Sequence, residues 1–317
     1  MTTRGFVLPI VSRRGGEIFP VSSLTVVPAK GAPTIRGKPA IQAHVFASGV
    51  EFCAAIPQDG RVKAWNQETW YTSGDREMFT GTKSMRAAKA LFLNPPKALR
   101  DQAEAAGKSL TVGEPMRQKP HTWNIAGAYP SVARALSGDP RAMRDVSWRK
   151  SPKMMTLLCN VMIPWYIEAG VLIEFSAAMG AAVDMIEAAG WRAEVWATQI
   201  GVSDDDFVGG CLVRLKATED ATDTAKLVAG LGHPSFLRRL CFGYASITDA
   251  LQPLGSSMGC AAAIMPADDV SGIYCTSLSA AYDALSHGSK EPTAQNFLAE
   301  IAGTLGRQGF AGFSEDN

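Results

Sequence analysis

The stretch TLLCNVMIPWYIEAGVLIEFSAAMGAAVDMIEAAGWRAEVWAT, residues 156–198, decides the fold class of this chain. Its first part, residues 156–167, is mostly apolar and predicts a strand. Residues 171–190 predict a helix that ends at Gly190, and residues 191–198 alternate apolar and polar as a half-buried strand does. A strand, a helix and a strand in succession favour an α/β sheet that is covered by helices on at least one face.

The alternation of strands and helices continues towards the C-terminus. Residues 208–217 predict a strand, with Cys211, Val213 and Leu215 on one face and Arg214 and Lys216 on the other. Further helices are expected over 221–232, 232–247 and 293–306, and further strands over 260–265 and 272–279. We therefore predict an α/β or α+β fold with a mixed sheet and covering helices.

The N-terminal half has a different pattern. Residues 1–40 are rich in Pro and Gly and carry six basic residues against the single acid Glu17, which predicts an extended basic arm. Residues 42–64 predict a β-hairpin with a PQDG turn. Two helices then flank Pro95 and Pro96, the second ending at Gly107 as its C-cap, and a short helix follows over 130–138.

Charge divides the chain of 317 residues at about residue 153. Residues 1–153 hold 23 Lys and Arg against 11 Asp and Glu, a balance of +12, and residues 154–317 hold 8 against 19, a balance of −11. We expect three parts: the arm 1–40, a basic hairpin and helical region 41–153, and an acidic α/β domain 154–317. The basic half can meet nucleic acid or an acidic partner, and it can equally meet the acidic half of this same protein.

Four segments carry a resemblance to a known family. They are FTGTKSMRAAKAL (79–91), WNIAGAYPSVARALSGDPRAM (123–143), MGAAVDMIEAAGWRAEVWA (179–197) and GLGHPSFLRRLCF (230–242). In this order they resemble an uncharacterised protein family found in phages and related mobile elements. The resemblance implies a gene of a bacterial virus or plasmid whose product acts in the host cytoplasm or the virion. It implies no activity or catalytic residue, and the segment before Trp70 carries none of its motifs, so we expect that segment to be specific to this protein.

Several classes of enzyme have no motif in this sequence. There is no GxxxxGK[ST] loop, no GxSxG elbow and no HExxH pair, and GLGHPS has a proline where a dinucleotide-binding helix would begin. The six cysteines are at least fifteen positions apart and the four histidines are scattered, so we expect buried thiols and no metal site. Asp204, Asp205 and Asp206 are expected in a solvated turn. We predict no cofactor, and no membrane span because acids interrupt the most apolar stretch.

The leading hypothesis for function is a non-enzymatic binding protein that takes part in genome handling or host takeover. Its contacts with nucleic acid or an acidic partner would come from the arm and from the two helices around Pro95. The predicted contact residues are Arg13, Arg14, Lys83, Arg86, Lys89, Lys97 and Arg100. Trp65, Trp70 and Tyr71 precede these helices and can stack on bases if they are exposed.

Two alternatives remain open. The first is a structural or assembly protein that associates with itself through its oppositely charged halves. The second is an enzyme whose site is assembled from separated residues, for which Asp139, Glu174, His233 and Arg239 are the candidates. The enzyme hypothesis requires these four side chains to converge on one pocket.

The segment GHPSFLRRLCF, residues 232–242, has both a chemical and a structural interpretation. His233 and Pro234 suit the N-cap and the first turn of a helix. The residues that follow place an apolar stripe on that helix, namely Phe236, Leu237, Leu240, Cys241 and Tyr244. Arg238 and Arg239 fall at its edges, where their heads can reach carboxylates. We interpret the segment as a helix junction in the core and expect His233→Ala to leave the fold nearly intact.

Overall fold

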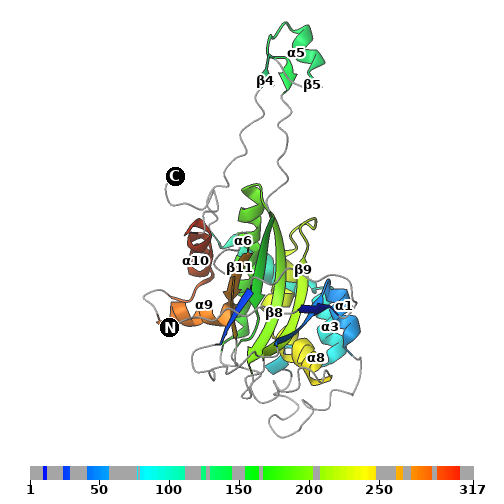
Figure 1. Cartoon of the computed structure of the whole chain (residues 1–317), viewed down its shortest axis with the longest axis vertical. Coiled ribbons are helices and arrows are strands. Elements are labelled where there is room, and N and C mark those ends of the chain that lie inside the picture. The colour runs from blue at the N-terminus through cyan, green and yellow to red at the C-terminus, as the bar shows by residue number, and fades with distance from the viewer. Residues whose placement is uncertain are drawn as a thin grey trace.

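A computed structural model describes most of the chain and shows a six-stranded mixed sheet with helices packed against it (Figure 1). The described residues are 10–12, 24–28, 41–56, 77, 79–110, 123–125, 129–144, 154–163, 167–202, 208–247, 262–266, 273–287 and 291–307. The mixed α/β class predicted from the sequence is confirmed.

The strand order of the central sheet is β1-β3-β9-β8-β7-β11. All neighbours pair in parallel except β8 and β9, which are antiparallel. The strands are β1 (Ile10–Ser12), β3 (Ile41–Phe46), β7 (Met154–Asn160), β8 (Arg192–Val202), β9 (Val208–Lys216) and β11 (Ile273–Ser277). At the close approach of β8 and β9, a Cβ on Gly210 would lie 1.7 Å from the carbonyl oxygen of Gln199, so only glycine fits there.

Helix α6 (Ala169–Ala188) connects β7 to β8, as residues 156–198 predicted. It ends just before Gly190, whose φ of 86° suits glycine. Ten of its residues are buried. By length and composition α6 is the one described helix that could cross a membrane, with 56% of its apolar stretch buried inside the protein. Burial in a protein core accounts for this composition, and the absence of a membrane span stays a prediction.

A layer of helices covers the face of the sheet on which α6 lies (Figure 1). Its members are α4 (Lys97–Lys108), α7 (Thr224–Leu231), α9 (Leu278–His287) and α10 (Ala294–Arg307). Phe297 of α10 stacks on Phe175 of α6 with the ring centroids 4.8 Å apart. Helix α9 was missed by the sequence analysis, and α4 includes Gly107 and ends one residue later, with Ser109 as its C-cap.

The N-terminal elements join this same core. Two strands are described within residues 1–40: β1 pairs with β3, and β2 (Leu24–Pro28) pairs with β10 (Ala262–Pro266). The predicted hairpin at 42–64 is wrong in its first arm, because β3 is followed by helix α1 (Gly49–Ala55); the predicted turn and second arm lie outside the described residues. One hydrophobic cluster extends from Phe46 to Leu305, and the three-part division of the chain stays a prediction.

A small unit lies apart from the central sheet in Figure 1. It consists of β4 (Trp123–Asn124), β5 (Tyr129–Pro130), β6 (Met143–Arg144) and the short helix α5 (Val132–Leu136). Strand β6 lies between β4 and β5 in a three-stranded sheet. Helix α5 falls within the predicted 130–138, and Arg134 forms an ion pair with Asp139 at 3.0 Å.

The predicted alternation of β9 breaks down at its end. Arg214 and Lys216 were expected on the same face, but a register shift beside Val195 and Trp196 interrupts the pairing with β8. The Lys216 side chain is only 3% exposed, and its ammonium donates to the carboxylate of Glu187 at 2.7 Å and to two backbone carbonyls. Because of this bulge, Lys216 does not share a face with Arg214. Its buried side chain links β9 to α6.

Residues 232–247 form the predicted helix junction. Six residues, Phe236–Cys241, are wound as a π-helix (η2), and α8 (Phe242–Ile247) continues from it. All five residues of the predicted apolar stripe are buried, namely Phe236, Leu237, Leu240, Cys241 and Tyr244. The structural interpretation of this segment is confirmed.

Replacement of Leu240 by Asp should unfold the protein. Leu240 is 0% exposed, and an unpaired carboxylate there would cost several kcal/mol, comparable to the whole stability of a domain. Circular dichroism and thermal melting test this. The matched control is Leu136→Asp, because Leu136 is 84% exposed and should tolerate the change. A Leu240→Asp variant that melts like the wild type would contradict the assignment of this helix to the core.

Candidate nucleic-acid interface

Helix α3 (Met85–Leu93) presents the first group of predicted contact residues. Ser84 caps it by accepting from the Ala87 N–H at 3.1 Å. Its inner face is fixed because Phe92 is buried with its ring centroid 4.8 Å from that of Phe236 in η2. Lys83, just before the cap, and Arg86, on the first turn, are left exposed to solvent.

Three predicted contact residues are free to meet a ligand. Lys83, Arg86 and Lys97, the last at the first position of α4, are all exposed. Within the described part of the chain, none of them has a hydrogen-bond or ion-pair partner. We call these three residues the basic surface. Among the described residues no carboxylate forms an ion pair with any of the three, so their charge is available to an anion.

The other predicted contacts already have partners or lie outside the described residues. Lys89 donates from its ammonium to the carbonyl of Ile56. Arg100 donates from Nε to the carbonyl of Pro95 at 3.1 Å, and its guanidinium is 3.5 Å from the carboxylate of Asp223 at the cap of α7. Lys89 therefore links α3 to the end of α1, and Arg100 links α4 to the start of α7. Arg13, Arg14, Trp65, Trp70 and Tyr71 lie outside the described residues.

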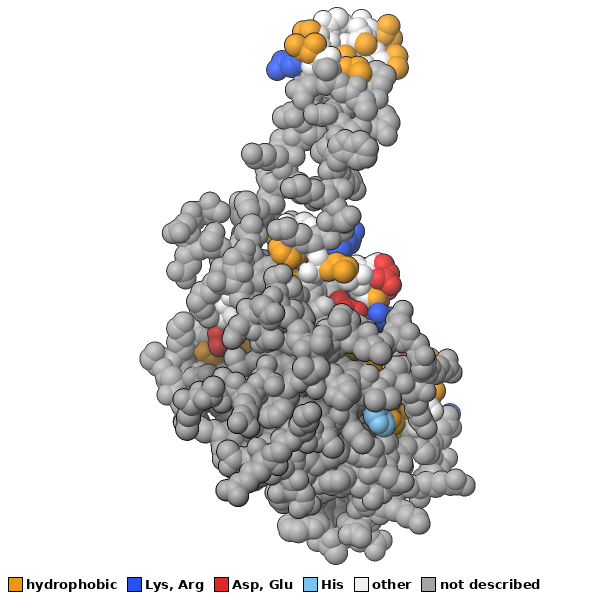
Figure 2. Space-filling model, viewed as in Figure 1, with side chains coloured by type: hydrophobic (Ala, Val, Ile, Leu, Met, Phe, Trp, Pro, Cys, Tyr) orange, Lys and Arg blue, Asp and Glu red, His pale blue; other side chains and the backbone are white. Residues whose placement is uncertain are grey.

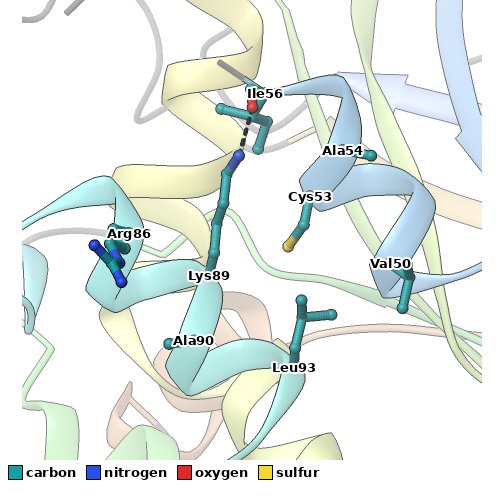
Figure 3. Close-up of a pocket in the computed structure, with 8 residues that line it drawn as sticks. All are labelled: Val50, Cys53, Ala54, Ile56, Arg86, Lys89, Ala90 and Leu93. Atoms are coloured by element: carbon teal, nitrogen blue, oxygen red, sulfur yellow. Dashed lines mark hydrogen bonds between the residues drawn. The ribbon is translucent and has the colours of Figure 1, made fainter. Parts of the chain in front are cut away.

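A pocket of about 360 Å³ opens between α1 and α3 (Figure 3). Its lining residues are Val50, Cys53, Ala54, Ile56, Arg86, Lys89, Ala90 and Leu93. Figure 3 shows Lys89 reaching from α3 to the end of α1, with the Cys53 sulfur directed between the two helices. Arg86 and Lys89, both predicted contact residues, therefore line a single hollow.

The charge of the pocket is positive. Burial raises the pKa of Cys53 to about 11, and the nearby Lys89 ammonium offsets this only in part, so the thiol stays neutral at pH 7. None of the described residues that line the pocket is a carboxylate. Six of the eight lining residues are apolar or neutral, so the pocket offers an apolar wall with two cations.

Two other buried thiols are inert. Burial raises the pKa of Cys159 to about 12 and that of Cys241 well above its ordinary value, with Cys211 and Cys53 as neighbours of Cys241. A buried protonated thiol is neither a nucleophile nor a ready metal ligand. Among the described residues no three His, Cys, Asp or Glu side chains are grouped as a metal site would require. Asp204, Asp205 and Asp206 lie outside the described residues.

The four candidates for a dispersed enzyme site do not form one site. Asp139 pairs with Arg134 in the small unit that contains α5, and Glu174 is exposed on α6. His233 and Arg239 belong to the junction around η2. The structure therefore brings together only the last two, and the pocket between α1 and α3 contains none of the four.

His233 serves as the N-cap that the sequence predicted. Its Nδ1 accepts from the Ser235 N–H at 3.3 Å and lies 2.8 Å from the Ser235 hydroxyl. On its other side it touches the segment before α3, where a Cβ on Gly81 would come within 2.9 Å of the imidazole. Gly81 has a φ of 70°, so both space and backbone conformation require glycine.

The two arginines of η2 also bind the segment before α3. Arg238 donates to the Phe79 carbonyl at 3.0 Å and lies over the Phe79 ring at 4.6 Å. Arg239 donates to the hydroxyl of Thr80 at 2.6 Å and to the hydroxyl and carbonyl of Thr82. Carboxylates were expected as partners of Arg238 and Arg239, whereas these contacts are with carbonyl and hydroxyl oxygens. They fix the segment that carries Lys83.

The sequence analysis missed the pocket because it assigned residues 49–55 to a strand. A usable signal was present in Ser48 and Glu51, the S-x-x-E spacing of a capping box. Ser48 accepts from the Glu51 N–H at 3.2 Å, and the Glu51 carboxylate accepts from the Ala47 N–H at 3.0 Å. A helix at 49–55 would have placed Cys53 opposite α3.

These observations define the class of the protein: an α/β protein with a mixed sheet, whose N-terminal helices carry a basic surface beside a pocket. The chain belongs to the family described as Domain of unknown function (DUF7192), whose model matches residues 38–303. The expected uncharacterised family is confirmed, and the match includes residues 38–69, so this part of the segment before Trp70 is not specific to this protein. No curated protein and no solved structure matches the chain.

The stability of the junction should depend on pH through His233. Burial lowers the pKa of His233 below its ordinary value of 6.5, so the unfolded chain takes up a proton first as the pH falls. The free energy of unfolding should therefore decrease from pH 7.5 to pH 5. His233→Asn keeps an acceptor for the Ser235 N–H but does not titrate, so its decrease should be smaller.

Urea unfolding at several pH values measures both decreases. His233→Ala serves as the control for the cap alone: it should lose about 1 kcal/mol at pH 7.5 without unfolding, and its pH dependence should be as weak as that of His233→Asn. Equal pH dependence in the wild type and His233→Asn would show that the imidazole is not buried as described.

Proposed function

We propose that this protein binds nucleic acid through the basic surface formed by Lys83, Arg86 and Lys97. The observation that carries the proposal is that these three exposed cations have no partner in the described part of the chain. A phosphate backbone supplies anions at regular spacing and releases counterions when cations bind it, so such cations favour its binding.

The surroundings of the basic surface support the proposal. The first 153 residues have a balance of +12 with 23 Lys and Arg against 11 Asp and Glu, which provides long-range attraction for a polyanion. The predicted contacts Arg13 and Arg14 add to this charge, and Lys89 and Arg100 stabilise the elements that carry the surface. The setting that we propose is genome handling by a phage or plasmid protein in the host cytoplasm.

Removal of the basic surface should weaken binding and its salt dependence together. In Lys83→Gln/Arg86→Gln/Lys97→Gln, the affinity for a fluorescent oligonucleotide should fall at least ten-fold at low salt. The slope of log K against log salt concentration should become shallower by about 2, since each single-strand phosphate contact contributes about 0.7. Fluorescence anisotropy over a salt series, with single-stranded and duplex probes, measures both quantities.

The matched control removes three other exposed cations, one at the opposite end of α4 and the others on β8 and α7, as Lys108→Gln/Arg192→Gln/Lys226→Gln. Its net charge equals that of the test variant, so a general charge effect would weaken both equally. The proposal fails if the wild type binds neither probe at low salt, or if the two triple variants bind alike.

A second candidate function is self-association, and the small unit around α5 favours it. Ile125, Val132 and Leu136 are 76%, 68% and 84% exposed, and they are three of the five most exposed large apolar side chains described. Figure 2 shows hydrophobic side chains gathered on this unit. Apolar side chains grouped at a surface are typical of protein contacts. A second copy also offers exposed acids, such as Glu168 at the N-cap of α6 and Glu174 within α6, to the basic N-terminal half of the first copy.

Self-association should depend on this apolar group. Sedimentation velocity should show a mass that rises with protein concentration, and Val132→Asp/Leu136→Asp should abolish the rise. Met154→Asp, at another exposed apolar residue, should retain it. A wild-type monomer at every concentration and salt would rule this function out.

A further inference from the structure

We propose that the pocket between α1 and α3 receives one unpaired nucleobase of a single-stranded nucleic acid whose backbone lies on the basic surface. This inference rests on the proposed function and adds to it a preference for single strands. It starts from Arg86, which belongs both to the basic surface and to the lining of the pocket.

The size of the pocket suits a single nucleotide unit. Its volume of about 360 Å³ lies at the small end of the range of small-molecule sites, which is enough for one nucleobase. Because duplex bases are paired and stacked, only an unpaired base can leave the strand and enter.

The chemistry of the lining suits a base with an attached phosphate. Val50, Ala54, Ala90 and Leu93 offer apolar contact to the faces of a flat ring. The Lys89 ammonium has three N–H donors and gives one to the Ile56 carbonyl, so the others remain for the acceptor atoms of a base.

The position of Arg86 connects the pocket to the strand. Its guanidinium is exposed and has no described partner, so it can hold the phosphate adjoining the inserted base. Lys83 lies three residues earlier on the same segment and can hold the next phosphate. The Cys53 thiol is neutral and no carboxylate is present among the described lining residues, so none of these residues repels an anion.

The test separates base recognition from phosphate recognition. Three fluorescent probes of equal length are compared by anisotropy: a single-stranded DNA, the same strand with abasic sites throughout, and a single-stranded RNA. The wild type should bind DNA or RNA about ten-fold more tightly than the abasic strand, which carries the phosphates alone.

Filling the pocket should remove this difference. Ala54→Leu/Ala90→Leu adds apolar volume at two exposed lining positions and changes no charge. This variant should bind the normal and abasic strands alike, with the salt dependence of the wild type. The control Ala105→Leu/Ala299→Leu makes the same change at exposed positions of α4 and α10 and should keep the wild-type preference.

Photocrosslinking locates the base directly. A strand containing 5-iodouracil should form adducts within residues 49–56 or 85–93 of the wild type, and the filled variant should lose them. Salt-dependent binding without preference over the abasic strand, or with adducts only elsewhere, overturns the pocket inference and leaves the basic surface intact. Absence of binding to every probe overturns both proposals.

Discussion

The packing of four aromatic rings holds the N-terminal elements against the C-terminal core, and the candidate site depends on it. Phe52 of α1 and Phe92 of α3 both contact Phe236 of η2, with ring centroids 5.7 and 4.8 Å apart. Phe46 of β3 joins the group through Phe52 at 5.0 Å. Phe52 of α1 and Phe92 of α3 both pack against the Phe236 ring, and these contacts fix the distance between the two helices. The space between the outer faces of α1 and α3 forms the pocket.

The polar contacts of η2 complete this arrangement. A π-helix brings Arg238 and Arg239 to the edge of the aromatic cluster, and both reach back about 160 residues in sequence to the segment before α3. Gly81 lets this segment pass close to His233. The buried face of the junction thus positions the start of α3 and thereby orients the residues proposed to bind nucleic acid.

The sequence predicted those parts of the fold that have a clear hydrophobic period. Residues 156–198 predicted a strand, a helix and a strand, and β7, α6 and β8 follow in that order, although β7 ends at Asn160 and not at residue 167. The stripe around Leu240 is buried as expected. Residues 49–55 were misassigned because Val50, Phe52 and Cys53 favour strands individually, while the capping residues Ser48 and Glu51 decided the outcome. The pocket needs that helix and a partner far along the chain, so no local pattern could reveal it. The cations on or just before α3 and α4 could be predicted, but which of them are free depends on contacts such as that of Arg100 with Asp223.

The distribution of partners among these cations is itself an argument for function. Lys89, Arg100 and Lys216 bind carbonyls or carboxylates, so the fold readily provides acceptors for basic side chains. Lys83, Arg86 and Lys97 lie on or just before α3 and α4, and no acceptor for them is found among the described residues. A binding surface explains this pattern because an anionic ligand supplies the missing acceptors. Phosphate contacts alone do not distinguish a single strand from a duplex. The proposed binding of an unpaired base in the pocket beside Arg86 would make this distinction.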